Sequence, residues 1–108
     1  MFVPCHPATR AVGHVADLNG NPIKGATVTL YGYEQITNTD GCFAFNVADA
    51  LPFKLSAGAP EFKNVEVVSK AGFFVIYVKL APVDSGESSE IRWKEINSHE
   101  YQNTKPCT

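Results

Sequence analysis

The sequence predicts an all-β sandwich, a fold in which two sheets pack face to face, and three observations lead to this fold class. Apolar and polar residues alternate along most of residues 10–80, which is the pattern of strands with one buried face. Clusters of Gly, Pro, Asn and Asp interrupt this alternation about every ten residues, the spacing of short strands in a sandwich. No segment before residue 82 shows the 3.6-residue period of an amphipathic helix.

Seven strands are expected in the body of the domain. Their predicted ranges are 10–16, 26–31, 35–38, 42–47, 52–57, 63–69 and 73–80. The first turn is rich in Asn, Gly and Pro around Gly20, and a second strong turn signal, Thr39-Asp40-Gly41, precedes the fourth strand. Gly20 and Gly41 suit turn positions with positive φ, where other residues meet a steric cost.

Alternation within the strands predicts which side chains form the core. In the fourth strand Phe43 and Phe45 share one face. In the seventh strand both faces are apolar, so the alternation alone does not say which face points into the core. The residues expected to point inward are Phe74, Ile76, Val78 and Leu80, and those left on the outer face are Phe73, Val75 and Tyr77.

The chain divides into an amino-terminal arm at residues 1–9, the sandwich at 10–82 and a carboxy-terminal extension at 83–108. The extension begins with residues 84–89, a polar stretch typical of a flexible connector. Residues 90–96 then alternate again, with Ile91 and Trp93 opposite Arg92 and Lys94. This segment is either an eighth strand or an arm that docks on the sandwich.

Composition and charge exclude several classes of protein. The apolar share of 44% is that of a globular chain, and the formal net charge is -2. No basic field is present to attract nucleic acid or an anionic membrane. No apolar run approaches the roughly 18 residues of a transmembrane helix. The amino end lacks the basic and apolar regions of a signal peptide, so either the protein is cytoplasmic or its export signal was removed.

Three cysteines bear on that choice of compartment. Cys5 and Cys107 lie near the two ends of the chain and Cys42 lies in the middle, so three single pairings are open. We favour Cys5–Cys107, because the two ends of a domain often lie close together. Such a disulfide would indicate an oxidising location, which is the periplasm, the outer membrane or the extracellular space.

A series of turn and strand motifs resembles the carboxypeptidase regulatory-like domain family. The similar segments, in chain order, are residues 13–17, 19–23 and 25–30, then Thr39-Asp40-Gly41-Cys42-Phe43, then residues 56–62 with Phe62 where the family has tyrosine. The resemblance covers residues 10–82 and implies a seven-stranded, transthyretin-like sandwich. It also implies a role as an accessory module of secreted or cell-envelope proteins.

Catalytic and metal-binding motifs are missing from the sequence. His6, His14 and His99 are far apart and have no metal-ligand spacing, and His14 is expected on the solvent side of the first strand. The acidic and amide side chains of residues 17–21 are interpreted as a turn cluster rather than a calcium site. A hydroxyisourate-hydrolysing relative of the transthyretin fold carries a carboxy-terminal Tyr-Arg-Gly-Ser motif, whereas residues 101–104 here are Tyr-Gln-Asn-Thr. No cofactor and no metal are expected.

The outer face of the seventh strand is the candidate functional surface. Three large apolar side chains in a row, Phe73, Val75 and Tyr77, are expected to be covered. The cover is either the extension, through Ile91 and Trp93, or a partner or second copy of the chain, and the remaining alternative is ordinary scattered exposure.

We therefore expect a non-catalytic, extracytoplasmic module that binds a protein or a glycan, or supports an envelope assembly. The alternatives are an accessory domain that positions a separate enzyme and a small transthyretin-like hydrolase. The one membrane contact considered is a lipid anchor on a cysteine upstream of Phe2, as in a lipoprotein.

Overall fold

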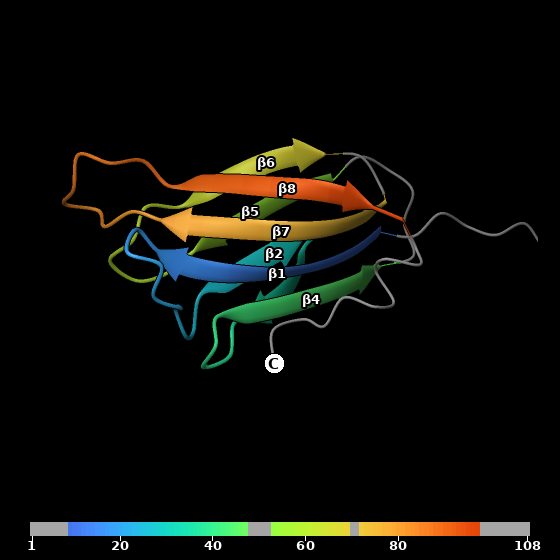
Figure 1. The fold of residues 1–108 in the computed structure, drawn as a ribbon, viewed down its shortest axis with the longest axis horizontal. Helices are drawn as coiled ribbons and strands as arrows, with labels where there is room; N and C mark the ends of the chain where they lie inside the picture. Colours follow the sequence, from blue (N-terminus) through green and yellow to red (C-terminus); the bar gives the residue numbers. More distant parts are fainter. Residues whose placement is uncertain (1–8, 48–52, 70–71, 98–108) are drawn as a thin grey trace, which may run out of the picture.

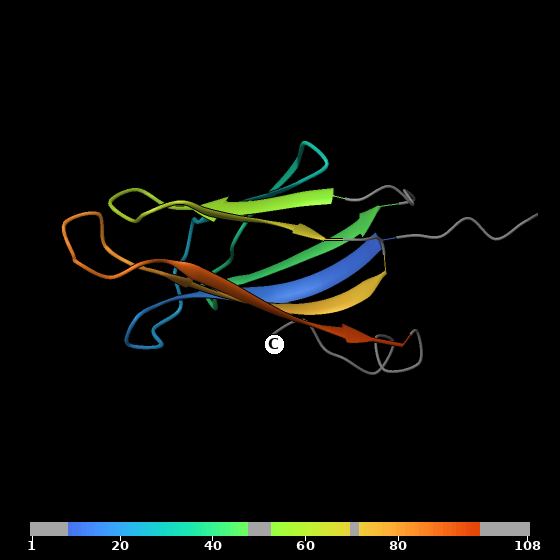
Figure 2. The ribbon, with the colours of Figure 1, turned by 90° about the horizontal axis from the view of Figure 1, so that it is seen from above.

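The computed structural model describes residues 9–47, 53–69 and 72–97, and these residues form an all-β sandwich (Figures 1 and 2). The strands are β1 (Thr9–Asp17), β2 (Thr27–Leu30), β3 (Tyr33–Ile36), β4 (Cys42–Val47), β5 (Phe53–Gly58), β6 (Val65–Ser69), β7 (Phe73–Leu80) and β8 (Glu90–Ile96). None of the residues described forms a helix long and apolar enough to cross a membrane.

The strands form two four-stranded sheets that lie as two layers (Figure 2). The first sheet has the order β4-β1-β7-β8 and the second has the order β3-β2-β5-β6. In the first sheet β1 runs parallel to β7 and antiparallel to β4. All strand pairs of the second sheet are antiparallel. The all-β sandwich predicted from the sequence is therefore confirmed.

The predicted count of seven strands is wrong, because residues 90–96 form an eighth strand beside β7. The third strand also lies two residues earlier than predicted. The reason is Thr37, whose buried hydroxyl donates to the carbonyl of Ile23 (2.6 Å) and accepts from the amide of Ala26 (2.9 Å). These bonds tie Thr37 to the segment that leads into β2.

The core lies between the two sheets and draws on both. Its fully buried members include Phe74, Leu30, Leu55, Ile76 and Leu80. Phe43 and Phe45 also lie in this core cluster, with ring centroids 5.9 Å apart in an edge-on arrangement. The inward faces predicted for the fourth and seventh strands are thus confirmed.

The Phe43 ring occupies the space where a side chain at Gly13 would be. A Cβ atom built at Gly13 would overlap the Phe43 ring and would lie 2.6 Å from the carbonyl oxygen of Ile76. Phe43 is the cross-strand partner of Gly13 on β4, and Ile76 is its partner on β7. β1, one of the two central strands of the first sheet, therefore needs glycine here for packing rather than for backbone conformation.

Residues 84–89, predicted to be a flexible connector, are held by hydrogen bonds in the structure. The Ser89 hydroxyl donates to the carbonyl of Lys63 (2.7 Å) and accepts from the amide of Ala81 (2.8 Å). The Lys63 ammonium donates to the carbonyls of Ser85 (2.8 Å) and Glu87 (2.6 Å). These bonds fix the chain where it turns from β7 into β8.

We expect Gly13→Ala to destabilise the domain by about 1–3 kcal/mol, the usual cost of overpacking a core. Urea unfolding followed by tryptophan fluorescence would measure this change. Gly86→Ala is the matched control, because a Cβ atom at Gly86 meets no atom within 4 Å. Equal unfolding midpoints for the two variants would contradict the packing role of Gly13.

Candidate functional site

The outer face of β7 carries the three side chains predicted for it. Phe73, Val75 and Tyr77 alternate with the buried residues of β7, and Tyr77 is 57% exposed. The guanidinium carbon of Arg10 lies 5.8 Å from the centroid of the Phe73 ring, within the range of a cation–π contact. This apolar stripe runs along the middle of the first sheet, next to β1.

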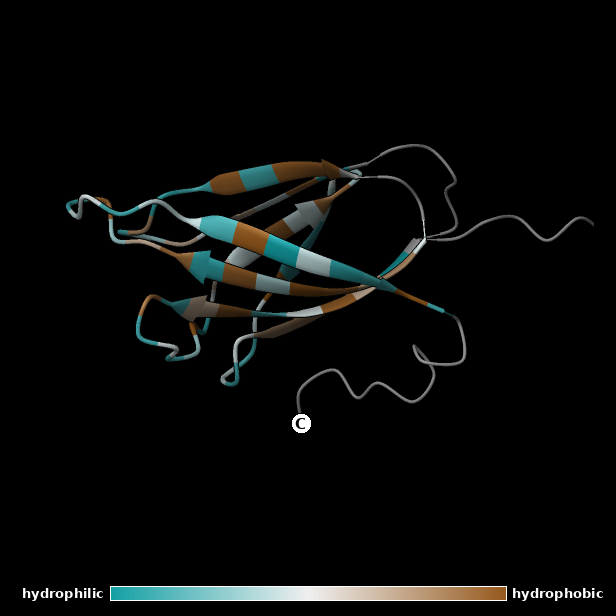
Figure 3. Ribbon diagram, turned by 45° about the horizontal axis from the view of Figure 1, so that its top comes forward, coloured by the Kyte–Doolittle hydropathy of each residue, from teal (hydrophilic) through white to brown (hydrophobic). Residues whose placement is uncertain are grey.

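Ile91 and Trp93 do not pack on this stripe, so the predicted docked arm is wrong and the alternative of an eighth strand is correct. β8 lies edge to edge with β7, with Ile91 opposite Val78 and Trp93 opposite Ile76. Because Val78 and Ile76 are buried, Ile91 and Trp93 lie on the core side of the sheet, and Figure 3 shows the resulting alternation along β8. Strand pairing satisfies the backbone groups along the edge of β7, which an arm laid across the face would leave unpaired.

A row of four side chains crosses the outer face of the first sheet. Cys42 is opposite His14, His14 is opposite Tyr77, and Tyr77 is opposite Arg92. His14 is partly buried on this outer side. Cys42 is disulfide-bonded. The row therefore brings together residues that are far apart in the sequence.

The predicted Cys5–Cys107 pair lies outside the residues that the structure describes.

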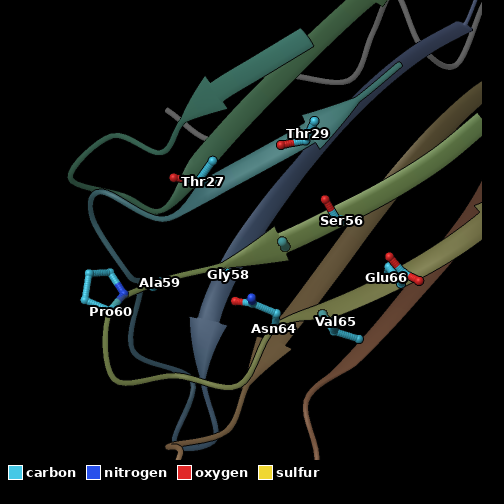
Figure 4. Close-up of a pocket in the computed structure, with 10 residues that line it drawn as sticks. Thr27, Thr29, Ser56, Gly58, Ala59, Pro60, Asn64, Val65 and Glu66 are labelled. Carbon is cyan, nitrogen blue, oxygen red and sulfur yellow. The ribbon is translucent and has the colours of Figure 1, made fainter. Parts of the chain in front are cut away.

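A groove on the second sheet is a site that the sequence analysis missed. It has a volume of about 610 Å³ and lies on the outer face of β2, β5 and β6 (Figure 4). The inward residues of β2 are Val28 and Leu30, so alternation turns Thr27 and Thr29 outward, and Ser56 lies opposite Thr29 on β5. The remaining lining residues are Ala57, Gly58, Ala59, Pro60, Asn64, Val65 and Glu66.

The polar side chains of the groove have unused hydrogen-bonding capacity. Within the described part of the chain, the hydroxyls of Thr27, Thr29 and Ser56 and the amide of Asn64 form no hydrogen bond with protein. Glu66 has one exposed ion pair, in which its carboxylate lies 3.7 Å from the Lys54 ammonium. Short hydroxyl side chains separated by one strand spacing thus line a hollow that is open to solvent.

Gly58 shapes one end of the groove. The Asn64 side chain packs directly over Gly58, and a Cβ atom there would overlap its amide group. A larger residue at position 58 would push Asn64 out of the groove. The sequence pattern marked Gly58 only as part of a turn, because this contact forms between two strands.

The loop at residues 17–21 forms the predicted turn around Asp17. Asp17 Oδ1 accepts hydrogen bonds from the amides of Asn21 and Asn19, each at 2.9 Å. These bonds, with that from Asn21 first, lower the pKa of the Asp17 carboxyl below its usual value. Among residues 9–47, 53–69 and 72–97, no group of three or more His, Cys, Asp or Glu side chains could hold a metal ion.

We expect acid to weaken the fold partly through Asp17. Because the pKa of Asp17 is lowered in the folded state, its contribution to stability is present above pH about 4 and is lost as pH falls through the folded value. The unfolding free energy of Asp17→Asn should therefore fall less between pH about 4 and 2 than that of the wild type. Urea midpoints at constant ionic strength measure this difference.

Asp84→Asn is the control for the acid experiment, since the Asp84 carboxylate accepts no hydrogen bond from another described residue. Identical pH profiles for the wild type and Asp17→Asn would contradict a role for the turn carboxylate in stability.

Neither a scan against protein-family models nor a search of curated proteins finds a match to this chain. The resemblance to the carboxypeptidase regulatory-like domain family thus stays a prediction.

Proposed function

We propose that this protein is a non-catalytic, extracytoplasmic binding module with a transthyretin-like sandwich, and that its groove binds a glycan. The observation that carries the proposal is the set of unpaired hydroxyl and amide groups of Thr27, Thr29, Ser56 and Asn64 along one hollow. The disulfide at Cys42 supports an oxidising compartment.

The groove chemistry suits a ligand that is itself rich in hydroxyl groups. Hydroxyl and amide side chains both donate and accept, so they can pair with sugar hydroxyls in either direction. Thr and Ser also lose little side-chain entropy when a ligand orders them, whereas long charged side chains lose more. Glu66 adds an acceptor at the far side of the groove.

The open shape of the groove predicts weak binding of a single sugar unit. At about 0.3 kcal/mol per non-hydrogen atom, a unit of about 12 such atoms gains roughly 4 kcal/mol, a Kd on the order of 1 mM. Binding to a polymer surface would then depend on several copies of the module acting together.

An NMR titration with a panel of oligosaccharides of different sugar composition tests the proposal. We expect the amide shifts caused by a bound oligosaccharide to cluster at Thr29, Ser56 and Asn64. The double variant Thr29→Val with Ser56→Ala should weaken binding at least tenfold, because it removes two hydroxyls and keeps the sheet. Ser88→Ala removes an exposed hydroxyl in the β7–β8 loop and should change nothing. Shifts confined to another face would overturn the proposal.

A protein partner is a second candidate, favoured by the exposed edge strand β3. β3 is an edge strand of the second sheet. All four of its residues are exposed, with Tyr33 at 61% and Ile36 at 56%. An open edge of this kind can pair with a strand of another chain or of a second copy. Its short length limits how many backbone bonds such a partner gains.

If β3 pairs with a second copy, sedimentation velocity should show concentration-dependent dimers of the wild type. Ile36→Lys should weaken this association at least tenfold, since it places a charge on the edge strand. Val68→Lys is the matched control, because Val68 is 65% exposed on β6 at the opposite edge of the same sheet. A wild-type protein that stays monomeric at high concentration would argue against self-pairing through β3.

A further inference from the structure

Charge is distributed unevenly over the two outer faces of the sandwich, although the whole chain has a formal net charge of -2. The register of the first sheet and the buried side of β1 and β7 show which of its side chains point outward. Among the described residues of this face, Glu90 is the carboxylate, and the cations are Arg10, Lys79, Arg92 and Lys94. On the outer face of the second sheet Lys54 is outnumbered by Glu34 and Glu66. Of the two faces, only the first therefore carries a net positive charge.

Three of these cations lie together on β8 and the adjoining end of β7, which run side by side in Figure 1. Arg92 is opposite Tyr77, and Lys94 lies two residues further along the same face of β8. Lys79 lies two residues after Tyr77 on β7 and is opposite Glu90. The side chains of Tyr77, Lys79, Glu90 and Arg92 line a hollow of about 350 Å³. Strand pairing thus gathers into one site cations that come from two separate segments of the chain.

This part of the face is open to solvent. Tyr77 is 57% exposed, and the Arg92 side chain is 79% exposed. Lys79 and Lys94 are also exposed, whereas Val12, further along the face, is buried. The accessible part of the face is therefore the end at which β7 leads into β8.

The cations of this hollow keep donors that a ligand can use. Arg92 Nε lies 3.2 Å from Glu90 Oε1, and this ion pair orients the guanidinium. The two terminal nitrogens of Arg92 form no hydrogen bond within the described part of the chain, so they can donate side by side to one carboxylate. Lys79 and Lys94 form no ion pair with any residue of the described ranges. The site can therefore accept several negative charges at once.

The spacing of the three cations matches that of alternate side chains in an extended polypeptide. Lys79 and Arg92 are diagonal neighbours on paired strands, which places them about 7–8 Å apart. Arg92 and Lys94 are two residues apart on one strand, a separation of about 7 Å. Every second side chain of an extended chain points to the same side, again at intervals of about 7 Å. Acidic residues at alternate positions of such a chain can reach Lys79, Arg92 and Lys94 in turn.

We propose that this end of the first sheet binds an extended acidic segment of a partner protein, with carboxylates at every second residue. Arg92 takes one carboxylate through its two terminal nitrogens, and Lys79 and Lys94 take the carboxylates on either side of it. Tyr77 lies beside Arg92 and adds a hydroxyl that can donate to the same segment. Because the charged groups are exposed, binding is weak and sensitive to salt. The glycan groove lies on the opposite sheet, so either proposal can fail alone.

Fluorescence anisotropy with two labelled peptides of identical composition tests the proposed spacing. In the first peptide Asp alternates with Thr over about nine residues, and in the second the Asp residues are contiguous at one end. We expect the wild type to bind the alternating peptide about threefold more tightly or better, because its carboxylates all face one side. Raising NaCl from about 0.03 M to about 0.3 M should weaken this binding about fivefold, since salt screens exposed charges. Equal affinity for the two peptides would overturn the proposal.

Matched double variants locate the site. Lys79→Gln with Arg92→Gln removes two cations from the hollow and should weaken the alternating peptide by about tenfold, the combined effect of two exposed charge pairs. The control, Lys24→Gln with Lys54→Gln, lowers the net charge by the same amount at exposed positions outside the strands of the first sheet. The control should bind the peptide almost as the wild type does. Equal losses in the two double variants would mean that net charge alone attracts the peptide, and the site would then be refuted.

An NMR titration of the wild type with the alternating peptide gives a test that needs no variant. The amide shifts should cluster at Tyr77, Lys79 and Arg92, and shifts confined to another face would contradict the site. Polygalacturonate and phosphatidylglycerol vesicles are the competing probes, because an acidic polysaccharide and an anionic membrane also carry negative charge. Displacement of neither probe by the peptide, with both bound at this face, would assign the site to another class of partner and overturn the proposal.

Discussion

The parallel pairing of β1 with β7 is the constraint on which the rest of the structure depends. Its register runs from Arg10 opposite Phe73 to Asp17 opposite Leu80, and it joins two segments about sixty residues apart in the chain. It brings the Ile76 carbonyl and the Phe43 ring against Gly13, where no side chain fits. It also leaves one edge of β7 open, and β8 completes the sheet there.

The two outer faces of the sandwich offer different chemistry because the outward positions of their strands hold different types of residue. On the second sheet the outward residues Thr27, Thr29 and Ser56 carry short hydroxyl side chains, and they line an open polar groove. On the first sheet the outward side chains of Val12, Phe73 and Val75 are apolar, and Val12 is buried. A polar hollow can stay wet until a ligand arrives, whereas an apolar stripe gains free energy when it is covered. The second face therefore suits a reversible ligand.

Most of the groove could not be predicted from the sequence, and the reason is physical. Thr27, Thr29 and Ser56 are ordinary solvent-side residues of predicted strands, and only the pairing of β2 with β5 sets them side by side. Asn64 joins them because it packs over Gly58, a contact across strands. The docked arm failed as a prediction for a related reason, since alternation in 90–96 indicates a strand with two faces but does not say which neighbour it pairs with.

The sequence by itself determined the all-β class, the ranges of β4, β7 and β8, and the inward residues Phe43, Phe45, Phe74 and Ile76, because period-two alternation and turn residues act locally along the chain. Only the tertiary structure decided which strands became neighbours, that an eighth strand closes the first sheet, and that Gly13 must lack a side chain. It also set Cys42 beside His14 and formed the groove. Those features depend on contacts between residues far apart in the chain, which no local pattern specifies.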